Sequence, residues 1–396
     1  MPESEGAKKA DLSLDALKVT VSTTSDLIAQ LVASTTTSTS SSYPSSETEK
    51  PVAKVTEEKE KSTDEVDALK LSFDSASLIR AHATKLSLLI INKPFTASAI
   101  TTILRELVAS PLPGLASAVE LCSAEKYTSA ASKELQYRAN KVFTELGSLV
   151  KKIPLDGQVL SSDQKNGGGK GSLASTGLVW DACDAVLELK TLGVAGLMIK
   201  RAEEYRDLVK DALEELQEWG AEESDDGEDE ESDVDDAEKD GIDNSAQDAL
   251  DDMFASHRHI PSDDPEKVRP RLESTQKRLR LIVLMYDAVI KRRLKTLPAI
   301  PHPQLPPELM EKSGGDPGIV SCLDEVLAVF SAVPDITDEL ANAFYELDGV
   351  EIDKRMDECF FKAFTAAELL LKNWEGKEDA FTIWARKFQI AMKKGW

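Results

Sequence analysis

The sequence has few residues that could form covalent or metal cross-links. Its four cysteines, Cys122, Cys183, Cys322 and Cys359, lie far apart, with no CxxC pair and no histidine at ligand spacing. The pattern therefore indicates neither a zinc site nor a disulfide framework, and we expect reduced, mostly buried thiols. Apolar runs are also short: Leu88–Ile91 is far below the ~20 residues that span a bilayer.

Signals for export and for β-strands are missing as well. The N-terminal stretch MPESEGAKKADLSL lacks the basic start and apolar core of a signal peptide. No Asn-Gly or Asp-Gly hairpin lies between alternating apolar runs, and clusters of β-branched residues are short. We therefore expect an intracellular, soluble, all-α protein.

Negative charge is the property that the chain has in excess. It carries 71 Asp and Glu against 47 Lys and Arg, a formal charge of −24. Residues 222–252 hold 17 acids and one lysine, which is −16 of this total and leaves −8 for the rest. A net-negative chain repels phosphate backbones, so we do not expect nucleic acid to bind over the whole surface.

Apolar periodicity near 3.6 divides the chain into two helical lobes and their connections. The expected parts are an N-terminal helix (1–33), a disordered Ser/Thr-rich insert (34–63), a first lobe (64–152), a flexible linker (153–174), a second lobe (175–219 and 265–394) and an acidic loop (220–264). The insert is expected to be disordered because it cannot bury enough apolar surface to offset its ordering entropy. Amphipathic helices of this kind pack as bundles.

The second lobe is expected to hold several amphipathic helices. Residues 175–192 and 194–219 carry apolar residues at three- and four-residue steps. Asp264 followed by Pro265 is a typical start for a helix that runs to Leu297. Further helices are expected at 318–333, 335–347, 352–374 and 377–394.

The acidic run contains a partial calcium-binding pattern. Asp236-x-Glu238-x-Asp240-Gly241 imitates the first half of an EF-hand loop, but the eighth and twelfth positions are Asp243 and Gln247. An EF-hand needs an apolar residue and a bidentate glutamate there. We therefore interpret the run as a solvated acidic loop without a specific metal site.

The acidic run has an electrostatic alternative to a bare spacer. Residues 267–295 carry ten Lys and Arg against two acids, a charge of +8, close in sequence to the −16 of residues 222–252. The run could bind this helix or a basic partner. Both readings stay open.

No cofactor or catalytic site is indicated elsewhere. Residues 166–172 (NGGGKGS) imitate a phosphate-binding loop, but Lys170 precedes Gly171 and no strand lies upstream. His257 and His259 have no third ligand at a suitable spacing, and His82 and His302 are isolated. We expect no metal, no cofactor and no enzymatic activity.

Two regulatory features can be proposed from local motifs. Ser232 and Ser245 each have an aspartate three residues on, which is the context that acidophilic kinases favour. The basic group Lys291, Arg292, Arg293 and Lys295 matches a nuclear-import patch. The alternative for this group is the cation-rich last turn of a helix, which the helix dipole favours.

Three elements carry a family resemblance. They are Leu178-Val179-Trp180-Asp181-Ala182-Cys183, Gly196-Leu197-Met198, and Val209-Lys210-Asp211-Ala212 with the acids that follow. With the acidic insert and the basic helix after it, this arrangement resembles the cyclin-D-interacting proteins, also described as Grap- and cyclin-D-binding. The resemblance is best over about 175–297 and weaker over 66–152 and in the C-terminal third.

The resemblance implies a function that the residues alone do not. It implies an all-helical protein without enzymatic activity that binds cyclins and helix-loop-helix factors and restrains cell-cycle progression and transcription, in nucleus and cytoplasm. The residues themselves argue for helical protein partners, without direct nucleic-acid or membrane binding. A cytoskeletal or adhesion scaffold of the vinculin and α-catenin type stays as an alternative, and so does a bundle that binds a small molecule between its lobes.

Overall fold

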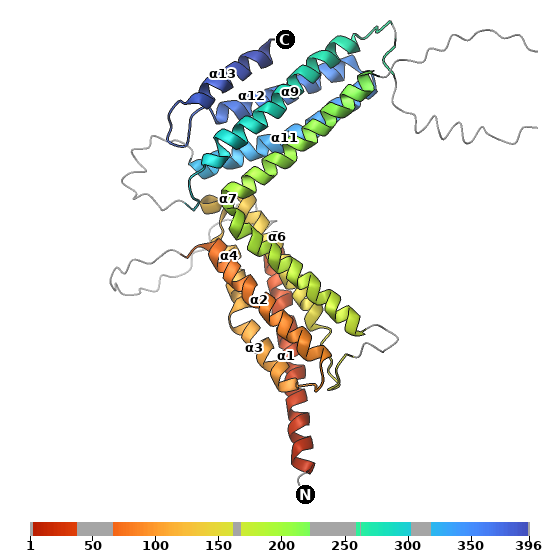
Figure 1. Cartoon of the computed structure of the whole chain (residues 1–396), viewed down its shortest axis with the longest axis vertical. Helices are drawn as coiled ribbons and strands as arrows, with labels where there is room; N and C mark the ends of the chain where they lie inside the picture. Colours follow the sequence, from red (N-terminus) through yellow and green to blue (C-terminus); the bar gives the residue numbers. More distant parts are fainter. Residues whose placement is uncertain are drawn as a thin grey trace, which may run out of the picture. The chain divides into compact units, whose positions relative to one another are not determined.

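The computed structural model describes residues 3–37, 66–160, 168–221, 259–261, 263–301 and 318–394, with backbone alone for 3–11 and 168–170. All regular secondary structure in these ranges is helical, which confirms the all-α class (Figure 1). Two compact units divide the chain: Met1–Val194 with Ile300–Met310, and Ala195–Ala299 with Glu311–Trp396. Most of the expected Ser/Thr-rich insert and acidic loop lies outside the described residues.

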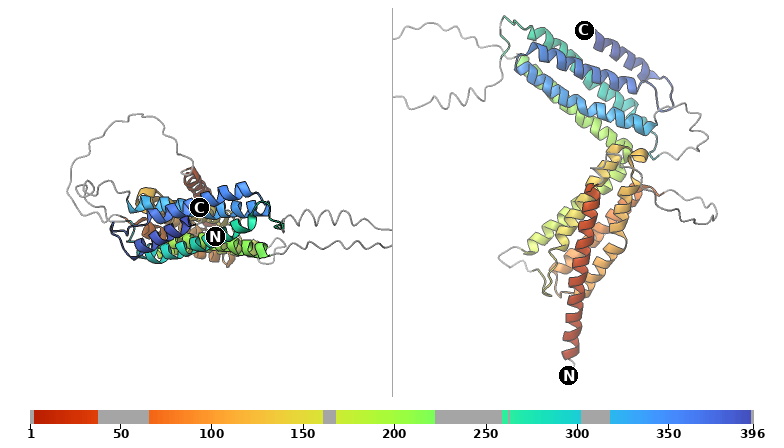
Figure 2. Two further views of the ribbon diagram at one scale, coloured as in Figure 1. Left: turned by 90° about the horizontal axis from the view of Figure 1, so that it is seen from above. Right: turned by 180° about the vertical axis from the view of Figure 1, so that it is seen from behind.

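The first unit is a bundle of antiparallel and crossing helices. Its elements are α1 (Glu3–Thr37), α2 (Ala68–Ile91), α3 (Ala97–Ala109), α4 (Pro111–Leu121), α5 (Ala124–Tyr127), α6 (Ser129–Val150) and the first part of α7 (Gly168–Ala221). Helix α1 packs against α3 and α6, and α2 packs against α4 (Figure 2). Each helix buries one apolar stripe, and the core includes Leu17, Ile79, Leu104 and Phe143.

Helix α1 extends past the residue at which the sequence pattern ends it. The Ser/Thr tract was expected to be disordered from residue 34, but α1 continues to Thr37. The reason is tertiary: Asn140 of α6 donates a hydrogen bond of 2.8 Å to the Thr35 hydroxyl, and Gln136 donates to the Thr35 carbonyl. These bonds satisfy polar groups that composition alone leaves to solvent.

Helix α7 belongs to both units. Gly193 has φ 61° and ψ −173°, outside the helical region, and Val194 is the last residue of the first unit. The second lobe was expected to begin at residue 175, so this boundary is corrected. Val179, Cys183 and Val186 are buried in the first unit, and their packing decides the assignment.

The second unit is built from the rest of α7 and the C-terminal helices. These are α9 (Val268–Arg292), the short 3₁₀ helix η1 (Leu294–Thr296), α11 (Ile319–Tyr345), α12 (Gly349–Leu369) and α13 (Ala380–Lys393). Helix α11 packs along α12, and α9 contacts both α12 and α13. In the core, the Tyr286 ring lies 4.6 Å from the Phe330 ring at a tilted angle, and its hydroxyl donates a hydrogen bond of 2.9 Å to the Phe330 carbonyl.

Two helix boundaries differ from the sequence pattern. Asp264 caps α9 from four residues before the helix, which begins at Val268. Its carboxylate accepts hydrogen bonds from the backbone amides of Val268 and Arg269. Pro334 was expected to separate two helices, yet α11 runs through it. Buried Phe330, Val333 and Leu340 hold both sides of the proline against the core, so packing outweighs the lost hydrogen bond.

Candidate protein-interaction surface

The element around Trp180 divides its side chains between the core and the surface. Val179, Ala182 and Cys183 are buried, whereas Trp180 is 36% exposed and Asp181 is exposed. This division follows from the helical period, which places residues three and four apart on one face. The exposed tryptophan therefore lies where another protein can reach it.

Helices α2 and α7 run antiparallel beside each other in the first unit (Figure 1). Three contacts establish their register: Asp67 pairs with Lys190 at 2.7 Å, Arg80 with Asp184 at 2.9 Å, and the Trp180 indole donates to the Thr84 hydroxyl at 3.0 Å. Residue numbers rise along α2 as they fall along α7. This register decides which exposed side chains are neighbours.

The polar end of this helix pair is held firmly. Although burial opposes ionisation of Asp67, its ion pair with Lys190 and its hydrogen bonds from Tyr127 and Leu69 outweigh this and lower the pKa of Asp67. The Tyr127 hydroxyl also accepts from the amide of Ala68. The start of α2 is thus tied to both α5 and α7.

At the other end of the helix pair, where α2 ends and α7 begins, apolar side chains are exposed. Leu88 lies one turn beyond Thr84 on α2, and on α7 Gly177 and Leu173 lie one and two turns before Trp180. Leu88 is 52% and Leu173 is 53% exposed, and a Cβ at Gly177 would meet nothing within 4 Å. We call Leu88, Leu173, Gly177 and Trp180 the α2–α7 seam.

The seam has the properties of a helix-binding surface. Arg80 lies over the Trp180 ring at 5.6 Å and pairs with Asp184, so the indole is held from one side while the side chain stays partly exposed. Partly exposed aromatic and leucine side chains within a charged rim are typical anchors for a partner helix. The seam carries no group suited to acid–base or nucleophilic chemistry.

The seam is only partly predictable from sequence. The motif identified Trp180, but Leu88 and Leu173 were not singled out, since in sequence they resemble core leucines. The spacing of Leu173, Gly177 and Trp180, four and then three residues, is the signal that could have placed them on one stripe. Their exposure depends on the neighbouring helices.

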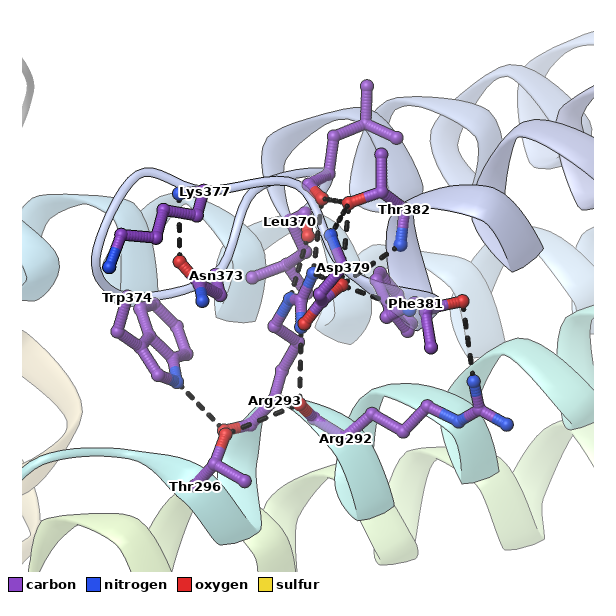
Figure 3. A network of polar contacts seen from close by, with 12 residues as sticks. Arg292, Arg293, Thr296, Leu370, Asn373, Trp374, Lys377, Asp379, Phe381 and Thr382 are labelled. Carbon is purple, nitrogen blue, oxygen red and sulfur yellow. Dashed lines mark hydrogen bonds and ion pairs between the residues drawn. The ribbon is translucent and has the colours of Figure 1, made fainter.

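The basic group at the end of α9 is divided by the fold. Lys291 and Arg292 are exposed in the last turn, and Lys295 is exposed in η1. Arg293 points inward and is 1% exposed (Figure 3). The four residues therefore do not form one continuous basic surface, and nuclear import through them stays a prediction.

Arg293 ties three parts of the second unit together. Its guanidinium pairs with Asp379 at 2.7 and 2.9 Å, donates to the carbonyls of Leu370 and Leu371, and lies 4.3 Å from the Phe381 ring (Figure 3). Hydrogen bonds from Arg293, and those from the amides of Thr382 and Phe381, hold the pKa of Asp379 well below its usual range. This is a structural network.

The remaining candidates have no shared site in the described residues. Cys122, Cys183 and Cys359 are buried free thiols, and burial raises the pKa of each to about 12. His82 lies 3.5 Å from Glu106, and burial lowers its pKa. Among the described residues, no group of three His, Cys, Asp or Glu side chains could hold a metal ion.

Several sequence candidates fall outside the described residues. They are Ser232 and Ser245, the EF-hand-like stretch Asp236–Gln247, and His257 and His302. Phosphorylation of the two serines stays a prediction. None of the helices in the described ranges combines the length and the apolar character needed to cross a bilayer.

Comparison with known proteins gives two findings. Residues 73–222 match the family described as Grap2 and cyclin-D-interacting, N-terminal. A protein of Schizosaccharomyces pombe, itself described as uncharacterized, is 28% identical over 154 residues, which is 39% of this chain and 44% of that relative. The matching segment thus spans less than half of the relative's length.

The matched range corrects where the resemblance is strongest. The sequence motifs placed it at about 175–297, but the family match runs from α2 to the end of α7 and stops before α9. It includes all the residues of the α2–α7 seam. Over residues 73–222, the chain is therefore similar to the Grap2 and cyclin-D-interacting protein family.

Proposed function

We propose that this protein is a non-enzymatic regulator of cell-cycle progression and transcription that binds a helix of a cyclin or of a helix-loop-helix factor. The observation that carries the proposal is the match of residues 73–222 to a family described as Grap2 and cyclin-D-interacting. The α2–α7 seam lies inside this range and offers exposed Trp180, Leu88 and Leu173. A partner helix that covers them buries apolar surface now in contact with water.

The physical mechanism is competition for a helix. A partner helix with apolar residues at i, i+3 or i+4, and i+7 matches the spacing of Leu173, Gly177 and Trp180. While bound, that helix is withheld from its other partners. Such capture restrains the partner without any chemical step, which agrees with a surface that lacks catalytic groups.

The test measures binding of purified candidates to the full chain. A D-type cyclin and a helix-loop-helix factor are titrated by isothermal calorimetry against the chain and against Leu88→Glu and Leu173→Glu. Each variant places a charge where the partner's apolar face would lie, so we expect at least a tenfold weaker affinity, about 1.4 kcal/mol. Leu208→Glu is the matched control, because Leu208 is 52% exposed on the same helix but away from the seam.

The outcomes separate this proposal from the scaffold alternative. If neither candidate binds and the chain co-sediments with actin filaments, a vinculin-like scaffold is the better description. If a candidate binds and Leu208→Glu weakens it as much as Leu173→Glu does, the seam is not the site. Nuclear and cytoplasmic location is part of the proposal, and imaging of the tagged full chain tests it.

A further inference from the structure

Helix α13 has an outward face that the second unit does not cover. Its inner face buries Phe381, Ala385, Phe388 and Met392 against the bundle. The outer face carries Ile383, Arg386, Lys387 and Ile390, at steps of three and four residues, and Lys394 follows directly after the last helical residue, Lys393. We call these five residues the α13 surface.

The α13 surface combines apolar and cationic side chains. Ile383 and Ile390 are seven residues apart, so they lie on one stripe two turns from each other, and each is 60% exposed. Lys387 lies between them, four residues after the first. Exposed β-branched residues at this spacing are typical of a seam that receives another helix.

A neighbouring aromatic cluster extends this surface at the end of α13. Lys393 lies over the ring of Phe364 on α12 at 4.8 Å. Phe361, three residues earlier on α12, is 64% exposed. One exposed cation and the partly exposed Phe364 ring therefore lie at the last turn of α13.

The charges of this surface are available to a partner. From residue 380 to residue 394 there are four cations and no acid. Arg386 pairs with Glu378 at 2.5 Å, but within the described part of the chain no carboxylate lies within ion-pair distance of Lys387 or Lys394. This local positive face belongs to a chain of net charge −24.

We propose that the α13 surface binds an acidic amphipathic helix of another protein. Its apolar residues, seven apart, would pack on Ile383 and Ile390, and flanking carboxylates would face Lys387, Lys394 and Arg386. Because the α13 surface is positively charged, the partner helix must carry negative charge, and the pairing of opposite charges determines its orientation. The site lies in the second unit, outside the family-matched range, and is independent of the α2–α7 seam.

The same residues fit an anionic membrane less well. A helix that lies on a bilayer inserts a broad apolar face, whereas the apolar face of α13 is already buried in the bundle and only two isoleucines point outward. A helical peptide needs only the narrow stripe that is present.

The test uses a fluorescent acidic peptide of about 20 residues with leucines at i, i+3, i+4 and i+7 and glutamates on the flanks. Fluorescence anisotropy measures its Kd for the full chain, for Lys387→Glu and for the double variant Ile383→Ser with Ile390→Ser. We expect each change to weaken binding at least tenfold. Lys141→Glu, an exposed lysine of the first unit, and Val350→Ser, an exposed valine of α12, are the matched controls and keep the original Kd.

Three results would overturn the proposal. A scrambled peptide of the same composition that binds equally well would show that only charge matters. Binding to phosphatidylserine vesicles with no binding of the peptide would assign the surface to a membrane. If the peptide binds only after residues 222–252 are deleted, the surface belongs to the chain's own acidic run. The circular dichroism spectrum of each variant should match that of the parent chain, which would show that weaker binding is not caused by misfolding.

Discussion

At the scale of single residues, Arg293 shows how the fold uses a charge that the sequence offers for another purpose. In sequence it is one of four cations in a basic patch. In the structure it is buried, and Asp379 and two backbone carbonyls neutralise or bind its guanidinium. A buried charge is stable only when it is paired in this way, so the pair can be tested by removing one partner.

We predict that Asp379→Asn lowers the free energy of unfolding by about 2 kcal/mol at pH 7, because it leaves Arg293 buried beside a neutral amide. The value allows for the 36% exposure of Asp379, which weakens the pair. The folded-state pKa is lowered, so the stabilisation is complete above the unfolded pKa near 3.9 and is lost as the pH falls below it.

Urea unfolding of this variant between pH 7 and pH 3 measures the effect. The difference from the parent chain should shrink as the pH falls below about 4. Lys377→Gln is the control, because its partner Glu375 is exposed in the same loop, and its unfolding midpoint should not move. A difference for Asp379→Asn that is constant with pH would show that the carboxylate charge is not the cause.

The cysteines give a second prediction at this scale. Buried Cys122, Cys183 and Cys359, with pKa values raised to about 12, contain almost no thiolate at pH 8. Cys322 is less buried. Titration of the native chain with Ellman's reagent at pH 8 should show one thiol that reacts quickly and three that react only after unfolding. Rapid reaction of all four would contradict the described packing.

At the scale of elements, α7 contains two glycines with opposite roles. Gly193 has φ 61° and ψ −173°, a region that is open essentially to glycine alone. Gly177 lies within the helix, and a Cβ there would meet nothing within 4 Å. The same substitution at the two positions should therefore have effects of opposite sign.

We predict that Gly193→Ala destabilises the protein by about 1–3 kcal/mol, because alanine is strained in that conformation. Gly177→Ala should stabilise it by up to about 1 kcal/mol, because alanine favours the helix and limits the unfolded chain. Thermal unfolding of both variants measures this. A gain in stability for Gly193→Ala would mean that α7 is continuous at that residue.

Helix boundaries illustrate the limit of sequence patterns at this scale. The all-α class and most helices could be read from a 3.6-residue period, and the break in α7 was expected between residues 192 and 194. The continuation of α11 through Pro334 and of α1 to Thr37 could not, because each depends on contacts with α12 or α6 that are distant in sequence.

At the scale of the whole molecule, the structure changes the hypothesis that the acidic run at residues 222–252 binds the basic helix at residues 267–295. The +8 of residues 267–295 is not one surface: Arg278 and Arg293 are buried, and Arg271 pairs with Asp353. Exposed cations remain on the α13 surface and, within residues 267–295, at Lys267, Arg269, Lys277, Arg280, Lys291, Arg292 and Lys295. Any shielding by residues 222–252 must act on these groups.

We predict that deletion of residues 222–252 creates salt-sensitive binding to polyanions, because it removes −16 of charge from the chain. The effect depends on many weak, screened charges acting together. Heparin chromatography compares the intact and the deleted chain, with deletion of a neutral stretch from the Ser/Thr tract, residues 38–46, as the control. If the intact and deleted proteins both flow through at low salt, the acidic run is a spacer.

Some properties of this protein follow from its sequence alone. The apolar period determines helices, the spacing of the cysteines gives no sign of a disulfide framework, and the motif around Trp180 indicates the family resemblance. These are local properties, since they depend on residues within a few turns of one another. The division of charge into an acidic run and a basic helix is local in the same sense.

Only the tertiary structure decided which of these residues are accessible. Trp180 and Leu88 form one surface because α2 and α7 are antiparallel in a register that ion pairs between distant residues establish. Arg293 is unavailable because Asp379, far along the chain, lies opposite it. Exposure is a property of neighbours that pack from elsewhere in the sequence, and a helical period alone does not say which neighbour covers which face.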